Sequence, residues 1–330
     1  MKVCICGGGS QGHVCAAVLG SRKDVSVNIL TTRPERWQAR VCADDVDGTH
    51  YEGSPEIISS DPSKAVAGCD VVLLCLPGYA IEEVLMKIRP HIKGAVVGSI
   101  VSSTGFFFFA HELLSPSVPL FGFKRVPYIA RVREYGASAN ILGGKPSLDA
   151  VFENVPDGMR LKTLLESFFS TKLNILDSYL EVSLSNSNPI LHTGRLYSLF
   201  KGKEDNVFDE CGRFYADWDD KSSEIEIAMD RELFAVLSLL KISSMKTLLD
   251  YYDSNDAHSL TMKLRSIKAF SSIPCPMIQR ADGGWIIDRS SRYFTEDFPF
   301  GLRWIKEIAK KQGVPTPVID EVYAWGLSLI

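Results

Sequence analysis

The first twenty residues carry the sequence feature that most restricts how this chain can fold. Residues 3–6 are apolar and predict a short buried strand, a run of glycines follows, and residues 13–19 show the apolar spacing of a helix. The order of strand, G-x-G-x-x-G and helix suits a pyrophosphate site, because the backbone must turn sharply, approach the phosphates and then pack closely. Free N–H groups at the helix start, with the positive end of the helix dipole, hold the anion. We therefore predict a dinucleotide cofactor that is bound through Gly7, Gly8, Gly9, Ser10, Gln11 and Gly12.

The residues that follow the second predicted strand indicate which dinucleotide is bound. In NAD-binding domains an acidic residue about 20 positions past the glycines accepts hydrogen bonds from the ribose. Here that place holds two threonines, of which Thr32 is the second, and Arg33 follows directly. A hydroxyl group with the guanidiniums of Arg33 and Arg36 suits the 2′-phosphate of NADP(H), so we favour NADP(H) over NAD(H). Two alternatives stay open: the arginines cap a solvated helix, or Glu35 serves NAD(H).

The first half of the chain alternates strand and helix signals. Residues 70–76 form the most strand-like run, and Leu76 and Pro77 at its end are expected to line the nucleotide. Further strands are predicted at residues 25–30, 94–101, 118–123, 137–142 and 173–176, and helices at 61–67, 79–88, 104–114 and 158–169. This alternation predicts an α/β Rossmann-type doubly wound parallel sheet, which we place in residues 1–177.

The second half has a different character. Strand signals nearly vanish after residue 179, and a polar, acidic segment at 203–221 is expected to be a solvated connection. Amphipathic helices are predicted at residues 223–240, 244–251, 260–270, 302–312 and 318–327. We therefore expect an all-α second domain over residues 178–330, with the active site in the cleft between the two domains. Four consecutive phenylalanines at 106–109 indicate core or a subunit contact, which leaves a homodimer open.

Composition excludes several classes of protein. With 330 residues, 45% hydrophobic and 23% charged, the chain has the length of two domains and an ordinary globular composition. A net charge of −4 gives no basic footprint, so a nucleic-acid partner is not expected. No apolar run is long enough to span a membrane, and no signal-peptide pattern is present. Eight scattered cysteines, without a C-x-x-C pair or a Cys/His cluster, predict reduced thiols, a cytoplasmic protein and no metal site.

Two segments of the second half carry side chains suited to a dehydrogenase. SNSNPILHTGR at 185–195 contains His192, and RYFTEDFPFG at 292–301 contains Arg292 and Asp297. Histidine exchanges protons near neutral pH, particularly beside a carboxylate that fixes its tautomer, and arginine binds a substrate carboxylate. From the chemistry alone a structural histidine is the more frequent outcome. We place Asn188 beside the histidine as a further substrate contact that helps to fix the imidazole or the nicotinamide.

These segments together resemble the opine dehydrogenase family, which includes octopine and nopaline dehydrogenases and the bacterial opine-metallophore enzymes. The resemblance also includes FKRVPYIARVREYGASANILGGK at 123–145 and IAMDRELFAVLSLL at 227–240, and it extends over nearly the whole chain. Its specific parts are N-P-x-x-H and R-Y-x-T-E-D-x-P-x-G-L, whereas the glycine motif is widely shared. Members of the family are usually longer, which implies shortened loops in the helical domain.

The resemblance implies a reductive condensation. A 2-oxo acid, such as pyruvate, and the amine of an amino acid form an imine, and NAD(P)H reduces it to a secondary amine. On this basis His192 corresponds to the catalytic histidine of the family, Asp297 to its partner and Arg292 to the arginine that contacts the charged groups of the substrate. The expected partners of the protein are therefore small-molecule substrates.

Two other functions are weighed against this one. A hydroxy-acid or ketopantoate-type reductase has a similar two-domain plan but uses a lysine at the start of its helical domain, and no lysine lies between Ser178 and Phe200. A non-catalytic NADPH-sensing module would bind the cofactor without turnover.

Overall fold

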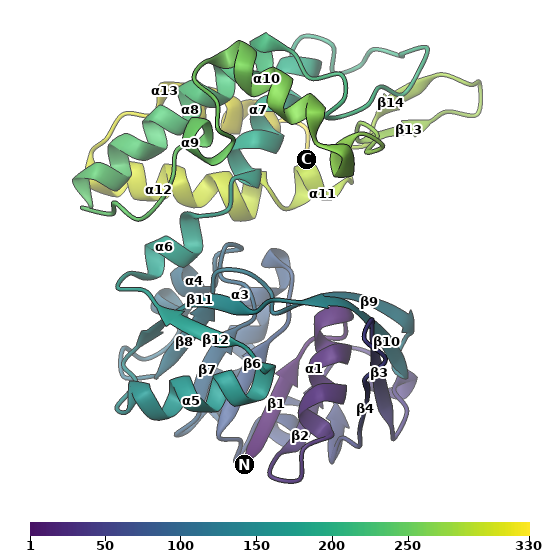
Figure 1. Ribbon diagram of the computed structural model, residues 1–330, viewed down its shortest axis with the longest axis vertical. Coiled ribbons are helices and arrows are strands. Elements are labelled where there is room, and N and C mark those ends of the chain that lie inside the picture. The colour runs from purple at the N-terminus through teal and green to yellow at the C-terminus, as the bar shows by residue number, and fades with distance from the viewer. The chain divides into compact units, whose positions relative to one another are not determined.

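A computed structural model describes all residues from 1 to 330 and divides the chain into two compact units, Met1–Ser183 and Leu184–Ile330 (Figure 1). Each unit is described by itself. No helix in either unit combines the length and the apolar character that crossing a bilayer requires.

The first unit is built on an eight-stranded sheet in the order β12-β11-β8-β7-β6-β1-β2-β5. Its strands are β1 (Lys2–Cys6), β2 (Ser26–Leu30), β5 (Ile57–Ser59), β6 (Val71–Leu74), β7 (Val96–Ser99), β8 (Leu120–Phe123), β11 (Ser147–Glu153) and β12 (Lys172–Ile175). All neighbouring strands from β5 to β8 are parallel, as the sequence predicts. Strand β11, which the sequence analysis missed, is antiparallel to β8 and parallel to β12, so one end of the sheet departs from the parallel pattern.

The helices of this unit lie close to their predicted positions. They are α1 (Ser10–Gly20), α2 (Pro62–Ala65), α3 (Gly78–Ile88), α4 (Phe106–Leu113) and α5 (Gly158–Phe169), with short 3₁₀ turns at Pro34–Arg36 and Arg89–His91. Helix α2 begins after Asp61, whose carboxylate accepts a hydrogen bond from the Ser63 N–H at 2.9 Å. In α4 the side chains of Phe106, Phe107 and Phe109 are buried, so the phenylalanine run belongs to the core and gives no argument for a homodimer.

A second sheet covers α1. Its four strands are ordered β4 (His50–Gly53), β3 (Val41–Asp45), β10 (Ser138–Gly144) and β9 (Tyr128–Glu134). Helix α1 packs against all four of them and against β1 and β2 of the large sheet (Figure 1). No strand is predicted from the sequence between residues 123 and 137, but β9 lies there and alternates buried and exposed side chains over its first half, as an edge strand does.

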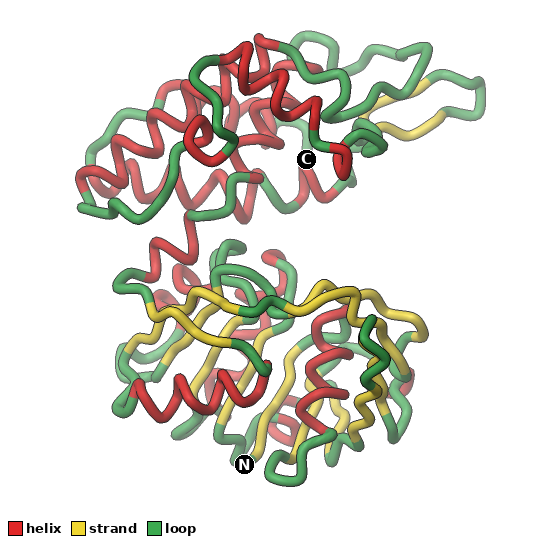
Figure 2. The backbone as a smooth tube through the Cα atoms, in the orientation of Figure 1, coloured by secondary structure: helices red, strands yellow, loops and turns green.

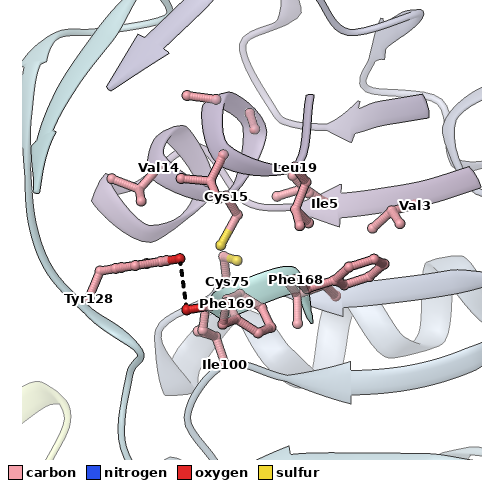
Figure 3. Packing of buried hydrophobic residues seen from close by; sticks show 14 of the residues in the cluster. Val3, Ile5, Val14, Cys15, Leu19, Cys75, Ile100, Tyr128, Phe168 and Phe169 are labelled. Atoms are coloured by element: carbon pink, nitrogen blue, oxygen red, sulfur yellow. Dashed lines mark hydrogen bonds between the residues drawn. The ribbon is translucent and has the colours of Figure 1, made fainter. Parts of the chain in front are cut away.

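The core of the first unit lies beneath the glycine run. Val3 and Ile5 of β1 pack with side chains of α1, and the sulfur atoms of Cys15 and Cys75 face each other there (Figure 3). The Tyr128 hydroxyl donates a hydrogen bond to a backbone carbonyl at the end of α5, at 3.3 Å. All eight cysteines are free thiols.

The second unit is helical (Figure 2). Its helices are α7 (Asn188–Phe200), α8 (Asp220–Leu239), α9 (Leu248–Tyr251), α10 (Ala257–Ser266), α11 (Arg292–Thr295), α12 (Arg303–Gln312) and α13 (Pro317–Leu327), with shorter turns at Lys268–Phe270 and Phe298–Leu302. Helix α6 (Tyr179–Leu184) spans the division between the units. The predicted fold class is confirmed, with one addition to the all-α domain: strands β13 (Met277–Gln279) and β14 (Trp285–Ile287) form an antiparallel pair.

The segment between α7 and α8 differs from its prediction as a solvated connection. Phe214, Tyr215 and Trp218 in this segment are buried, with exposed fractions of 0%, 6% and 0%. The acidic residues around them had suggested solvent, but the three aromatic rings anchor the second half of the segment in the helical unit.

Candidate active site

The glycine loop has the backbone that the motif predicts. Gly7 has φ +126°, and a Cβ atom there would lie 2.4 Å from the Cys75 carbonyl oxygen, so no larger residue fits. A Cβ atom on Gly12 would lie 2.1 Å from the Gly7 carbonyl oxygen, because α1 starts directly against the end of β1. The loop is therefore held between β1 and β6.

The loop lies at the point where the order of the strands in the sheet reverses. Strand β1 pairs with β2 on one side and with β6 on the other, and ligands of doubly wound sheets bind outside the carboxyl ends of strands at such a point. The N-terminus of α1 follows Gly9, and no side chain caps it. A Cβ atom on Gly9 would meet no atom within 4 Å. Uncapped N–H groups beside open space fit a pyrophosphate.

His13 supports this loop from below. Its Nδ1 donates to the Gly9 carbonyl oxygen at 2.9 Å, and its Nε2 accepts from the Gly136 N–H at 2.6 Å. The ring is fully buried and stacks on Trp37 at 4.3 Å between ring centres. Burial lowers the pKa of His13, so the imidazole is neutral and serves as a structural support.

Ser10 and Gln11 join the loop to the second sheet. The Ser10 hydroxyl accepts from the Val132 N–H at 3.2 Å, and the Gln11 amide donates to the Tyr128 carbonyl oxygen at 2.7 Å. Both side chains therefore fix α1 against β9, whereas their backbone N–H groups belong to the helix start.

The residues predicted to contact the adenosine lie after β2. Thr32, Arg33 and Arg36 lie at the surface, and the Arg36 guanidinium lies 4.4 Å from the centre of the Tyr135 ring. A Cβ atom on Gly8 would lie 2.5 Å from the Tyr135 hydroxyl, so this tyrosine reaches the glycine loop. Tyr135 is not among the residues predicted from the sequence, because it lies in the short turn between β9 and β10 and in no motif for the dinucleotide.

Leu76 and Pro77 follow β6 on the other side of the loop. The Leu76 Cδ2 atom lies 3.1 Å from the place of a Cβ atom on Gly7. Pro77 precedes α3 as its N-cap residue, and both side chains are half-buried. Both residues therefore lie beside the glycine loop, and their contact with the nucleotide stays a prediction.

A second constellation lies in the helical unit, around His192 on α7. The Nδ1 atom of His192 is 2.7 Å from Oδ2 of Asp297, and the two side chains are 10% and 16% exposed. An ionised carboxylate only accepts hydrogen bonds, so Nδ1 carries the proton of this bond. The opposite ring nitrogen, Nε2, lies 2.9 Å from the Tyr215 hydroxyl.

Packing fixes both members of the His192–Asp297 pair. Helix α7 approaches α8 closely because residue 194 is glycine, where a Cβ atom would lie 2.7 Å from the Glu226 side chain. Asp297 follows α11 and precedes the turn Phe298–Leu302, whose first side chain is fully buried. The ring of Tyr293 meets the His192 ring edge to face at 4.4 Å. Residues separated by 105 positions in sequence are thus held in hydrogen-bond contact.

Arg292 and Asn188 lie near this pair in sequence but outside its hydrogen bonds. Arg292 lies at the surface at the start of α11, next to Tyr293. Asn188 is exposed at the start of α7, one turn before His192. Neither side chain hydrogen-bonds to the histidine or to Asp297.

Tyr215 is the residue of this constellation that the sequence analysis missed. The available signal was R-F-Y-A-D-W at 213–218, a group of aromatic residues within an otherwise acidic segment. Arg195, which the sequence places in the same motif as His192, is fully buried and hydrogen-bonds to the carbonyl oxygens of Phe214 and Asp217. Its role is to hold the segment that presents Tyr215.

Comparison with known proteins gives two family matches. Residues 175–330 match the family described as NAD/NADP octopine/nopaline dehydrogenase, alpha-helical domain. Residues 2–103 match the family described as NADP oxidoreductase coenzyme F420-dependent. The first match covers the whole second unit and the end of the first, and the second match lies within the first unit.

Individual relatives agree with these matches. The octopine dehydrogenase of Mizuhopecten yessoensis is 28% identical over 98% of this chain and 89% of its own length. The opine dehydrogenase of Haliotis discus hannai is also 28% identical, over 98% and 89%. A solved structure of octopine dehydrogenase with NADH and L-arginine superposes with a TM-score of 0.87 at 26% identity, covering 99% of this chain and 89% of that one. The chain is thus homologous to octopine and opine dehydrogenases over nearly its whole length, and its helical half matches the model of that family. The homology shows an opine dehydrogenase-like, NAD(P)-dependent oxidoreductase that reductively condenses a 2-oxo acid with an amino acid.

Proposed function

We propose that His192 is the acid catalyst of this condensation and that Asp297 orients it. The observation that carries the proposal is the 2.7 Å hydrogen bond between Nδ1 of His192 and the Asp297 carboxylate. The carboxylate fixes the tautomer and stabilises the imidazolium, so the proton that leaves the ring is the one on Nε2. A buried pair of this kind, with only a small exposed surface, suits repeated proton exchange with a bound substrate.

The reaction needs protons at two steps. In the condensation the amine nitrogen bonds to the carbonyl carbon and the carbon–oxygen bond breaks. The oxygen leaves as water with one proton from His192 and one from the amine, and the second amine proton returns His192 to its cationic form. When bound, the reduced nicotinamide supplies the hydride that adds to the carbon of the resulting C=N bond. A proton that adds to the nitrogen completes the secondary amine. In our proposal His192 is the source of this proton.

We assign Arg292 and Asn188 to substrate binding. The guanidinium of Arg292 has no acidic partner at salt-bridge distance, and its neighbour Tyr293 contacts the His192 ring. A guanidinium in that position suits a carboxylate of the 2-oxo acid, which it binds with two parallel hydrogen bonds. The Asn188 amide, one turn from His192, is suited to a polar group of the same substrate.

We propose NADP(H) as the favoured dinucleotide, bound at the glycine loop. Thr32, Arg33 and Arg36 all lie at the surface after the end of β2, and no acidic side chain pairs with either arginine. Two cations and a hydroxyl group suit the dianionic 2′-phosphate. NAD(H) lacks that phosphate and would leave these groups without a ligand.

The two parts of the machinery lie in different regions of the sequence. We propose residues 1–177 as the dinucleotide-binding domain and residues 178–330 as the substrate and catalytic domain. Eight free thiols support a reducing compartment such as the cytoplasm. The partners in this proposal are small molecules, a 2-oxo acid such as pyruvate and an amino acid.

An NADPH-oxidation screen tests the proposal. Each 2-oxo acid is offered alone, each amino acid alone, and the two together, over a panel of amino acids. We expect oxidation only in the presence of both substrates. Oxidation with the 2-oxo acid alone would instead identify a hydroxy-acid reductase, and no oxidation with any pair would favour a nucleotide sensor.

The same screen with His192→Asn tests the catalytic assignment. We expect the variant to keep its melting temperature and its affinity for NADPH but to lose turnover by roughly 10²–10⁴-fold, the usual contribution of general acid–base catalysis. The matched control is His258→Asn, because His258 is an exposed histidine that also pairs with an aspartate, at 3.1 Å from Asp220. Wild-type turnover in His192→Asn would remove the assignment.

A further inference from the structure

The nitrogen that we propose as the proton donor already has a hydrogen-bond partner. Nε2 of His192 lies 2.9 Å from the Tyr215 hydroxyl, and both residues are almost completely buried. A proton that leaves Nε2 in this structure therefore has the Tyr215 oxygen as its nearest acceptor. The substrate must either displace this hydroxyl or receive its proton through it.

Displacing Tyr215 would disrupt several contacts. Its ring stacks on Phe270 at 4.5 Å and on Trp218 at 5.4 Å between ring centres. Arg195 binds the carbonyl oxygens on both sides of Tyr215 and donates to the Ser222 hydroxyl at 2.8 Å. Since Arg195 lies on α7, the helix that carries His192 also fixes the segment that carries Tyr215. Rotation of the hydroxyl about its C–O bond, by contrast, disturbs none of these contacts.

The Tyr215 hydroxyl is suited to hydrogen-bond with His192, whose charge changes during the reaction. Burial raises the pKa of Tyr215, so the side chain stays a neutral phenol while the imidazole exchanges protons. A phenol both donates and accepts hydrogen bonds. It accepts from Nε2–H when His192 is cationic and donates to Nε2 when His192 is neutral, so the ring keeps its orientation in both states. A carboxylate or an ammonium would match only one of them.

We propose that Tyr215 is a catalytic residue that relays the proton from His192 to the substrate. The Nε2–H bond breaks as the proton moves to the Tyr215 oxygen, and the phenol O–H proton moves at the same time to the departing oxygen or to the imine nitrogen. Tyr215 ends as a neutral phenol and His192 as a neutral imidazole, with one proton delivered and no change in oxidation state. Arg195 acts through Tyr215 and is a positioning residue. The relay rests on the proposed role of His192.

The variant Tyr215→Phe removes the hydroxyl and keeps the stacked ring. With both substrates saturating, we expect kcat to fall roughly 10²–10³-fold, within the range for general acid–base catalysis, and the affinity for NADPH to stay unchanged. The matched control is Tyr252→Phe, which removes another buried hydroxyl of the same unit, one whose pKa burial raises to about 12. The control should keep the wild-type kcat. Wild-type kcat in Tyr215→Phe would overturn the relay.

A proton inventory tests the relay on the wild-type protein, so the test does not depend on the folding of a variant. Single-turnover rates are measured in mixtures of H₂O and D₂O. Two protons in flight predict a curved dependence on the deuterium fraction, whereas a straight line would overturn the relay. Different results would contradict the relay and the proposed role of His192. Full activity in Tyr215→Phe with an inactive His192→Asn removes the relay alone, and full activity in both removes the role of the histidine.

Discussion

At the scale of single residues, the two hydrogen bonds of His192 differ in kind. Asp297 can only accept from Nδ1, at 2.7 Å, so it sets the tautomer in every step. Tyr215 both donates and accepts at Nε2, so it leaves the proton of that nitrogen free to move. One partner fixes the ring and the other permits the charge change that acid catalysis requires.

In our proposal, single side chains also decide the cofactor preference. We predict that Arg36→Ala raises the Kd for NADPH roughly 10- to 100-fold, as expected for the loss of hydrogen bonds to a charged group, and changes the Kd for NADH little. Titration of protein fluorescence with each dinucleotide measures both constants. Arg40→Ala is the control, because Arg40 is an exposed arginine nearby that pairs with Glu52 at 3.3 Å. An equal loss for both dinucleotides would contradict a contact with the 2′-phosphate.

The contact between His192 and Asp297 could be predicted across 105 positions, because each residue lies in a short motif and the two side chains are chemically complementary. Tyr215 was not identified, because the acidic residues of its segment outweigh its aromatic neighbours in a local pattern. Its burial depends on Arg195 and Phe270, and a contact between three separate segments leaves no periodic signal.

At the scale of elements, the glycines of the N-terminal strand–loop–helix meet two different requirements, one of the fold and one of the ligand. Gly7 and Gly12 are needed for the fold itself, since a Cβ atom on either would overlap a carbonyl oxygen. Gly9 has open space around it and a backbone at φ −85° and ψ −173°, which other residues adopt readily. Its glycine is therefore required only by a ligand that approaches the backbone closely.

We predict opposite outcomes for two alanine substitutions in this loop. Gly12→Ala should destabilise the fold by about 1–3 kcal/mol, as overpacking does, and lower the melting temperature. Gly9→Ala should leave melting unchanged and weaken dinucleotide binding by roughly tenfold or more, because the added methyl group occupies the place of the phosphates. Calorimetry and a binding titration measure the two effects. Unchanged affinity in Gly9→Ala would contradict a pyrophosphate at this loop.

The elements that the sequence predicted are those with strong internal patterns, such as β1, β6 and α5. The missed strands β9 and β11 are amphipathic, with arginine or acidic residues on one side, and they depend on partners for their stability. Strand β9 pairs with β10 and covers α1, which are contacts that no local window contains.

At the scale of the whole molecule, our proposal divides the chemistry between the units. All the residues assigned to the dinucleotide lie in Met1–Ser183, and the histidine, aspartate and tyrosine lie in Leu184–Ile330. Each unit has its own buried core, from Val3 and Ile5 in one to Phe294 and Trp304 in the other. The fold class was predictable because sheet and helix patterns occupy separate halves of the sequence. The predicted substrate contacts of Arg292 and Asn188 stay predictions, because both side chains lie at the surface and their expected partner is a substrate.

The most direct test of the central claim follows the hydride itself. The protein is incubated with NADPH that carries two deuterium atoms at the nicotinamide C4, a 2-oxo acid and an amino acid that are active in the screen, and the products are analysed by mass spectrometry. We predict a secondary amine with a single deuterium on the carbon that was the carbonyl carbon of the 2-oxo acid. A deuterated 2-hydroxy acid with the amino acid left unchanged would contradict the account.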